Sequence, residues 1–284
     1  SSAEPIPEKI KKSTVVILLI MHSYMAKVNI RMQLNSHFFK ILLPNFLLTA
    51  VSFYVLFTDF QWLFLLYAFL GFYILGIFGA AIGYHRYISH SSFQVNNFWK
   101  NAFIICGALT GQGSPIFWAG LHHHHHRFSD TKQDVHSPVN GFFNAFIGWQ
   151  IFKPIETVPG VAPRWLYKNS LVKPIHRHYH KFYWGSVSVA YLIDIYFGLF
   201  FMTLGGWFLI NLIEDLGNVY FHHPTKGYQN YNTPDNSKNV HWLAYITLGA
   251  GYHNNHHKWP GKYRFGEKVN EPDIAAWFIE KIKK

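Results

Sequence analysis

The chain has 284 residues, of which half are apolar and only 14% are charged. Soluble domains carry about 25% charged residues, so this composition is typical of a membrane protein. The formal net charge is +11, and an excess of Lys and Arg on the cytoplasmic face of a membrane protein explains it without a nucleic-acid partner. The single cysteine, Cys106, excludes an internal disulfide, a Cys-x-x-Cys pair and a cysteine-ligated metal site.

Residues 1–37 are predicted to form an N-terminal cytoplasmic or interfacial segment. Their one apolar run, Val15 to Met21, is too short to cross a hydrocarbon core of about 30 Å. We therefore expect an interfacial helix there.

Two apolar stretches follow, and we predict that residues 38–57 and 62–82 cross the membrane. The second stretch has no charged residue from Trp62 to Ile82, which makes it the strongest membrane signal in the chain. The next apolar stretch, Phe98 to Trp118, is interrupted by Lys100, glycines and a proline. We interpret it as an interfacial or re-entrant segment.

A second pair of crossings is predicted at residues 183–202 and 206–222, with a hinge at Leu204-Gly205-Gly206. Neither predicted far-side loop, Thr58 to Gln61 or Thr203 to Gly206, contains Lys or Arg. The positive-inside rule then places both termini and the polar segments 83–182 and 223–284 in the cytoplasm. We predict a single domain over residues 1–284.

Two histidine runs share the pattern H-x-x-H-H. One begins at His122, within five consecutive histidines, and the other begins at His253. On a helix, the positions i, i+3 and i+4 lie on one face within about 100°. Imidazoles gathered on one face can hold a transition metal, although a single run of this kind is equally compatible with a surface histidine patch.

A third group, His85 and His90, follows the longest apolar stretch. Residues five apart are about 140° apart on an ideal α-helix. Both can serve one site only if the helix frays there or if the site holds two metals. The alternative is a pair of interfacial histidines.

Several phrases of the sequence together resemble the membrane-bound fatty acyl desaturases of the delta-9, stearoyl-CoA desaturase-like group. In chain order they are GYHRYISH, HHHHHRFSDT with DVHSP, GFFNAFIGW, and NTPDNSKN with GAGYHNNHH. The resemblance covers about three quarters of the chain, from Phe38 to Trp259. It implies an all-α integral membrane protein in which four transmembrane helices are capped by a cytoplasmic helical region that holds a histidine-rich di-iron site.

The resemblance also implies which residues bind the two irons. Asn218 would contact iron through a water molecule. The direct ligands would be nine histidines: His85, His90, His122, His125, His126, His222, His253, His256 and His257. Compared with the family, the chain has about two extra residues between His222 and Gly227. His223 is therefore an alternative to His222 as the iron ligand.

Carboxylates near these histidines have two possible roles. Asp130 and Asp134 are candidates to accept hydrogen bonds from iron-ligating imidazoles, although Asp134 is equally compatible with a solvated loop. Glu214 and Asp215 lie in the last predicted crossing, where acidic residues are functional candidates by default. They can also lie close enough to the cytoplasmic end to be solvated. The remaining histidines that fit no motif are expected to be structural: His22, His37, His176, His178, His180 and His241.

The activity implied is O2-dependent insertion of a cis double bond, at the delta-9 position, into a saturated acyl chain carried on CoA, a lipid or acyl carrier protein. A lipid or hydrocarbon hydroxylase with the same di-iron site is the alternative, and a non-catalytic histidine-rich metal transporter is a remote one. The sequence has no haem-binding motif, iron–sulfur cysteine set or G-x-G-x-x-G, so we expect a separate ferredoxin or cytochrome b-type electron donor. The expected location is a bacterial inner membrane or the endoplasmic reticulum.

Overall fold

The computed structural model describes residues 34–152 and 161–284, and within them it is helical, with two isolated β-bridges and no strand. The interfacial helix predicted at Val15 to Met21 lies outside the described residues. Residues Asn35–Lys284 form one compact unit. The elements are η1 (Phe38–Leu42), α2 (Leu43–Thr58), α3 (Trp62–Gly71), η2 (Phe72–Ser89), α4 (Asn97–Ala108), α5 (Pro115–Phe128), η3 (Pro138–Asn140), η4 (Asn144–Gly148), α6 (Trp149–Phe152), α7 (Arg164–Lys168), α8 (Val172–Arg177), α9 (Tyr179–Ile193), η6 (Phe197–Leu209), α10 (Ile210–Tyr220), α11 (His241–Ile246), α12 (His253–Lys258) and α13 (Ile274–Ile282).

Three continuous helices in the described part are long and apolar enough to cross a membrane: Phe38–Thr58, Trp62–Ser89 and Phe197–Tyr220. The first two contain the predicted crossings 38–57 and 62–82. The second helix continues beyond the apolar stretch, through η2, to the first histidine motif. The segment Phe98 to Trp118 is not one of these three helices, because a turn with positive-φ glycines at Gly111 and Gly113 divides it into α4 and the start of α5.

The predicted hinge at Leu204-Gly205-Gly206 is wrong. These residues lie inside η6, and the chain turns instead at Asp194, which is extended and whose carboxylate accepts a hydrogen bond from the backbone N–H of Phe197. The residues of the predicted crossings 183–202 and 206–222 are therefore divided differently. Those up to Ile193 belong to α9, and the long helix Phe197–Tyr220 follows.

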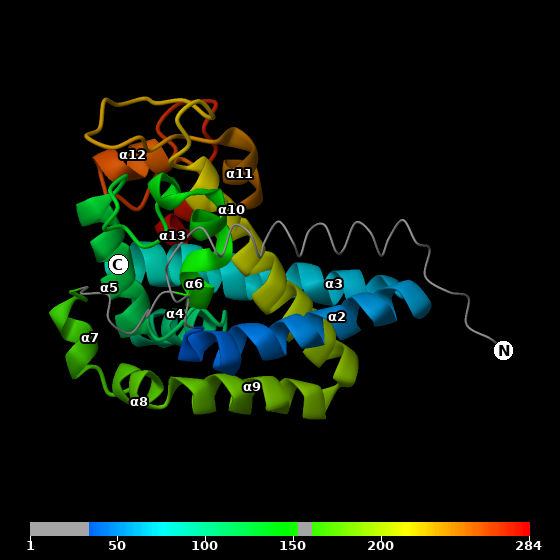
Figure 1. The fold of residues 1–284 in the computed structure, drawn as a ribbon. Coiled ribbons are helices and arrows are strands. Elements are labelled where there is room, and N and C mark those ends of the chain that lie inside the picture. Colours follow the sequence, from blue (N-terminus) through cyan, green and yellow to red (C-terminus); the bar gives the residue numbers. More distant parts are fainter. Residues whose placement is uncertain (1–33, 153–160) are drawn as a thin grey trace, which may run out of the picture. The chain divides into compact units, whose positions relative to one another are not determined.

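The glycines that suggested a hinge serve close helix packing instead. A Cβ atom at Gly205 would lie 2.1 Å from the backbone oxygen of Ala68, and one at Gly71 would lie 2.1 Å from that of Phe201. Small residues let the backbones of α3 and η6 touch, as in many membrane helix pairs. Because η6 also packs against α2 and α9, it holds these helices together (Figure 1).

The helix that carries His85 is tied to the C-terminal segment by a buried ion pair. Arg86 and Asp273 are both fully buried, and the guanidinium lies 3.2 Å from each carboxylate oxygen. The Asp273 carboxylate also accepts hydrogen bonds from the backbone of Phe265 and Ala276, and the guanidinium lies over the Phe265 ring. The last residues of the chain thereby fix the end of η2.

Replacing Asp273 by alanine is expected to destabilise the protein strongly, because the Arg86 charge would stay buried without a partner. Breaking a buried pair in this way costs about 3–5 kcal/mol. The midpoint of thermal unfolding in detergent micelles measures the effect. The matched control is Arg264→Ala, which removes a solvent-exposed ion pair with Glu280 and should change the midpoint little. Equal shifts in the two variants would contradict this account.

Candidate metal centre

The first histidine pair is brought to one face by a change in helix winding. At the end of η2, the backbone N–H of His90 donates to the carbonyl of His85, a bond between residues five apart. The Ser89 hydroxyl likewise donates to the carbonyl of Tyr84. In π-winding, residue i+5 approaches residue i as i+4 does in an α-helix. The objection that His85 and His90 point about 140° apart on an ideal α-helix therefore does not apply.

Each H-x-x-H-H run divides its histidines between two clusters. On α5, His122 and His126 join one cluster and His125 joins the other. On α12 the division is reversed, so that His253 and His257 stand with His125, and His256 stands with His122 and His126. Within the shared face, position i+4 lies about 40° to one side of i and position i+3 about 60° to the other side, so each helix can supply both clusters.

Two clusters result, and they contain all nine histidines of the predicted set. In each cluster the candidate ligand atoms lie within 4.8 Å of one another, an arrangement that can hold a metal ion. The five-histidine cluster contains His85, His90, His122, His126 and His256. The four-histidine cluster contains His125, His222, His253 and His257.

The spacing of the imidazole nitrogens fits a metal ion. In the five-histidine cluster, the Nε2 atom of His256 lies 2.8 Å from that of His85 and 2.9 Å from that of His126. Two nitrogens bound at ~2.0–2.1 Å to one ion, at about a right angle, lie about 3 Å apart. In the four-histidine cluster, the Nε2 atoms of His222 and His253 lie 3.1 Å apart, and Nε2 of His257 is buried without a hydrogen-bond partner. A metal would satisfy these nitrogens.

Burial keeps most of these imidazoles neutral, which is the form that binds metal. Burial lowers the pKa of His90 to about 3, and His123 reinforces the effect. Burial, reinforced by neighbouring imidazoles, also lowers the pKa of five further members: His122, His126, His253, His256 and His257. His125 differs: burial is the largest single influence and lowers its pKa, but Asp134, together with Asp130 and Asp235, raises the pKa by more, so the net shift is upward.

Three aspartates orient the four-histidine cluster. Asp134 lies 2.9 Å from Nδ1 of His125, Asp130 lies 3.1 Å from Nδ1 of His222, and Asp235 lies 2.7 Å from Nδ1 of His257. A carboxylate that accepts the Nδ1–H bond leaves Nε2 free to bind metal, fixes the ring and raises its basicity. Among the described residues, no ion pair to a carboxylate is formed by the five-histidine cluster. The two clusters therefore differ in the negative charge around them.

The sequence predicts this role for Asp130 and Asp134 but not for Asp235. Asp134 is buried and hydrogen bonded, so it is not a solvated loop residue. Asp235 stands in the NTPDNSKN phrase, and its acidic side chain within a phrase shared with a metal-dependent family was the available signal. A tight turn aims it, since Asp235 also accepts a hydrogen bond from the backbone of Ser237.

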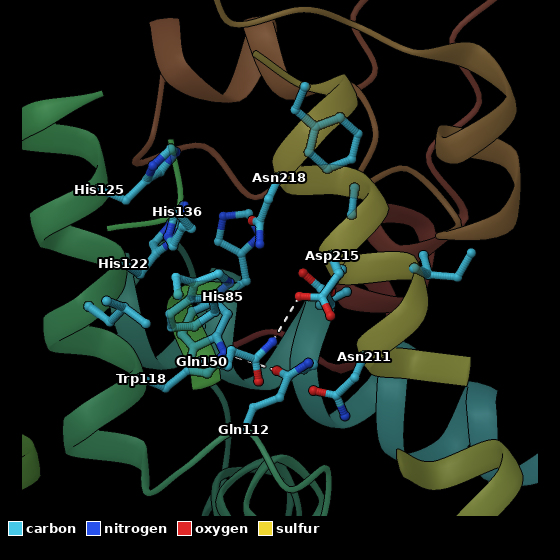
Figure 2. Close-up of a pocket in the computed structure, with 18 of the residues that line it drawn as sticks. His85, Gln112, Trp118, His122, His125, His136, Gln150, Asn211, Asp215 and Asn218 are labelled. Atoms are coloured by element: carbon cyan, nitrogen blue, oxygen red, sulfur yellow. Dashed lines mark hydrogen bonds between the residues drawn. The ribbon is translucent and has the colours of Figure 1, made fainter. Parts of the chain in front are cut away.

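The structure brings His222 into the cluster and leaves His223 outside it. The ring of His223 instead accepts a hydrogen bond from the backbone of Thr225. Asn218 lies one helical turn before His222 and lines a cavity beside the histidine clusters (Figure 2). The side-chain amide of Asn218 lies 3.4 Å from the carbonyl oxygen of Ala145. Its contact with a metal through water stays a prediction.

A cavity of about 110 Å³ adjoins both clusters. His85 and His122 line it from the five-histidine cluster, and His125 lines it from the other (Figure 2). His222 and His253 of the four-histidine cluster also line it. Trp118 stacks on His122 and donates its indole N–H to Gln112, so aromatic and amide groups border the histidines.

The two acidic residues of the last crossing face this cavity. Asp215 is 4% exposed and accepts a hydrogen bond of 2.8 Å from the side chain of Gln150, which comes from α6. Glu214 is half-buried and lines the same space. Asp215 is thus a buried, hydrogen-bonded group and not a solvated one.

Replacing Asp235 by asparagine is expected to weaken metal binding. The change keeps the side-chain shape but removes the charge beside His257, and loss of such a partner costs about 10- to 100-fold in metal affinity. Metal retained per protein after dialysis against graded chelator measures this. Asp59→Asn, in the exposed loop between α2 and α3, is the matched control. Retention equal to that of the wild type would contradict a metal-orienting role for Asp235.

The metal-free protein is expected to lose stability as the pH falls below about 6.5. The lowered folded-state pKa values mean that the unfolded chain binds more protons there, with each group contributing up to about 1.4 kcal/mol per pH unit. Thermal unfolding in detergent with chelator, at pH 7.5, 6.5 and 5.5, measures the loss. His256→Gln should show a smaller loss between pH 7.5 and 5.5. A wild-type midpoint that is flat across this range would refute the expectation.

Comparison with known proteins identifies the family. Residues 60–265 match the fatty acid desaturase family model. The chain is 34% identical over 230 residues to a sn-1 stearoyl-lipid 9-desaturase of Synechocystis, an alignment that covers 78% of this chain and 69% of that protein. It is 32% identical to a sn-1 stearoyl-lipid 9-desaturase of Anabaena variabilis, with 80% and 83% covered, and 32% identical to Delta-9 acyl-lipid desaturase 1 of Arabidopsis thaliana, with 73% and 68% covered. The chain therefore belongs to the fatty acid desaturase family and is a desaturase, an oxidoreductase of unsaturated fatty acid biosynthesis.

Proposed function

We propose that the protein is an O2-dependent acyl desaturase that inserts a cis double bond at the delta-9 position of a saturated fatty acyl chain. The observation that carries the proposal is the convergence of nine histidines into two clusters beside one cavity. The relatives support the regiochemistry, since all three are named as 9-desaturases.

Two iron ions are the proposed cofactors, one in each cluster, with Asn218 in contact with iron through water. Imidazoles suit iron, and the chain has no cysteine set that would favour a softer site. When bound, the irons would supply, with O2 and two electrons, the oxidising power needed to remove hydrogen from an unactivated methylene.

The chain's own residues would position the substrate and the metals. Trp118 and Phe117, together with aliphatic side chains of the cavity wall, would hold methylenes beside the histidines and exclude water. Asp130, Asp134 and Asp235 would keep Nε2 of their histidines directed into the cluster. Burial would keep the imidazoles in the metal-binding, neutral form.

The proposed substrate carrier is a membrane lipid, because the relatives are named as acyl-lipid enzymes. CoA and acyl carrier protein are the other carriers, and the test below separates them. The electrons would come from a separate ferredoxin or a cytochrome b-type protein.

We also propose four membrane crossings with the metal centre in the cytoplasm. α9 would be the fourth: its first residue, Tyr179, accepts a hydrogen bond from Gly113 before α5, and its last turn leads to the start of η6. Its end exposes apolar side chains such as Leu192 and Ile193, as a lipid-facing helix would. The turns at residues 59–61 and 194–196 contain no Lys or Arg, which supports their position outside the cytoplasm.

Expression in a desaturase-deficient host, together with a matched ferredoxin or cytochrome, tests the function. Wild-type protein should produce a new monounsaturated acid with the bond at carbon 9, located by derivatisation and mass spectrometry. His256→Ala, at equal protein level, should reduce the product at least ~100-fold, because the variant loses an imidazole of the five-histidine cluster that would bind iron. Separating lipid classes before hydrolysis identifies the carrier that is unsaturated first. A hydroxylated lipid as the sole product would replace desaturation by the hydroxylase alternative.

A further inference from the structure

A second cavity, of about 80 Å³, meets the cavity beside the histidines at a polar wall. The two cavities share three lining residues: Gln150, Asn211 and Asp215. The rest of the second lining comes from η1, α2, η4, η6 and α10 and consists of Leu42, Phe46, Phe146, Ile147, Trp207, Phe208 and Leu212. These aromatic and aliphatic side chains suit a hydrocarbon chain.

The polar wall is held by a hydrogen bond between elements that are far apart in the chain. The side chain of Gln150 on α6 donates to Asp215 on α10 at 2.8 Å, and both residues are more than nine-tenths buried. Asn211, one turn earlier on α10, is fixed by bonds to the carbonyls of Thr110 and Trp207. Figure 2 shows Gln150 reaching across the cavity to Asp215.

Neither cavity alone can hold a long acyl chain. A cavity of about 150 Å³ holds a single benzene molecule, and each of these two spaces is smaller. A substrate whose reacting methylenes lie beside the histidines must therefore extend beyond the first space. The apolar cavity is the adjoining space with the right chemistry, and the Gln150–Asp215 pair stands between them.

We propose that the Gln150–Asp215 hydrogen bond is the partition that the methyl end of the acyl chain must pass, and that this pair sets the preferred chain length. The inference rests on the proposed desaturase function. While Gln150 and Asp215 are hydrogen bonded, they limit how many carbons of the acyl chain fit beyond the reacting position. A smaller side chain at either residue would open a longer path into the apolar cavity. The position of the new double bond is set beside the histidines, so substitutions at Gln150 or Asp215 would leave it unchanged.

The test compares Gln150→Ala and Asp215→Ala with the wild type in a host that supplies both 16- and 18-carbon saturated acids. The ratio of 18- to 16-carbon monounsaturated product should rise about tenfold or more in both variants, because each methylene that an apolar pocket accepts or rejects changes discrimination by about tenfold or more. Asp215→Asn should restore the wild-type ratio, because the asparagine carbonyl accepts the same hydrogen bond. Active alanine variants with the wild-type ratio would overturn the proposal.

A second measurement needs no turnover. Saturated fatty acids of 14 to 20 carbons are added to each purified protein, and the thermal stabilisation is recorded in detergent. The chain length that stabilises best should be longer for both alanine variants than for the wild type, and an unchanged optimum would refute the partition. Wild-type protein that shows a length optimum but makes no unsaturated product would instead count against the proposed function alone.

Discussion

Nine imidazoles are gathered in the interior of one protein, and their nitrogens need partners there. Burying a polar group without a partner costs several kcal/mol, and protonating these rings would place like charges side by side. The arrangement is tolerable because the nitrogens converge at the ~3 Å spacing of ligands on a common ion. Three of the rings also donate a hydrogen bond from Nδ1–H to an aspartate carboxylate. The surrounding fold holds these rings at that spacing.

Different segments of the chain share this task. The helix Trp62–Ser89 brings His85 and His90 out of the apolar region, and the helix Phe197–Tyr220 ends beside His222. The C-terminal segment holds η2 and α12 in place: Asp273 pairs with Arg86, while Glu271 accepts a hydrogen bond from Asn255, which lies between His253 and His256. A metal centre built by segments so far apart in sequence requires the whole described unit to be folded.

The two clusters are unequal in their surroundings. Three carboxylates contact the rings of the four-histidine cluster, whereas the five-histidine cluster is bordered by aromatic rings such as Trp118 and Phe265. Negative charge close to a cation favours its binding and its higher charge state, and an apolar border disfavours both. The architecture thus gives chemically distinct environments to two sites made from nearly the same ligand type.

The H-x-x-H-H runs, the charge-poor segments before them and the family phrases predict from the sequence which residue types form the centre, because short-range periodicity and composition are local properties. The tertiary structure establishes how the histidines divide between the clusters, since that depends on how α5 and α12 face each other. It also decided that His85 and His90 converge through π-winding, that Gly205 packs against α3 and does not form a hinge, and that Asp235 and Gln150 find partners on other elements. Those outcomes come from contacts between segments distant in the chain, which no local pattern of residues encodes.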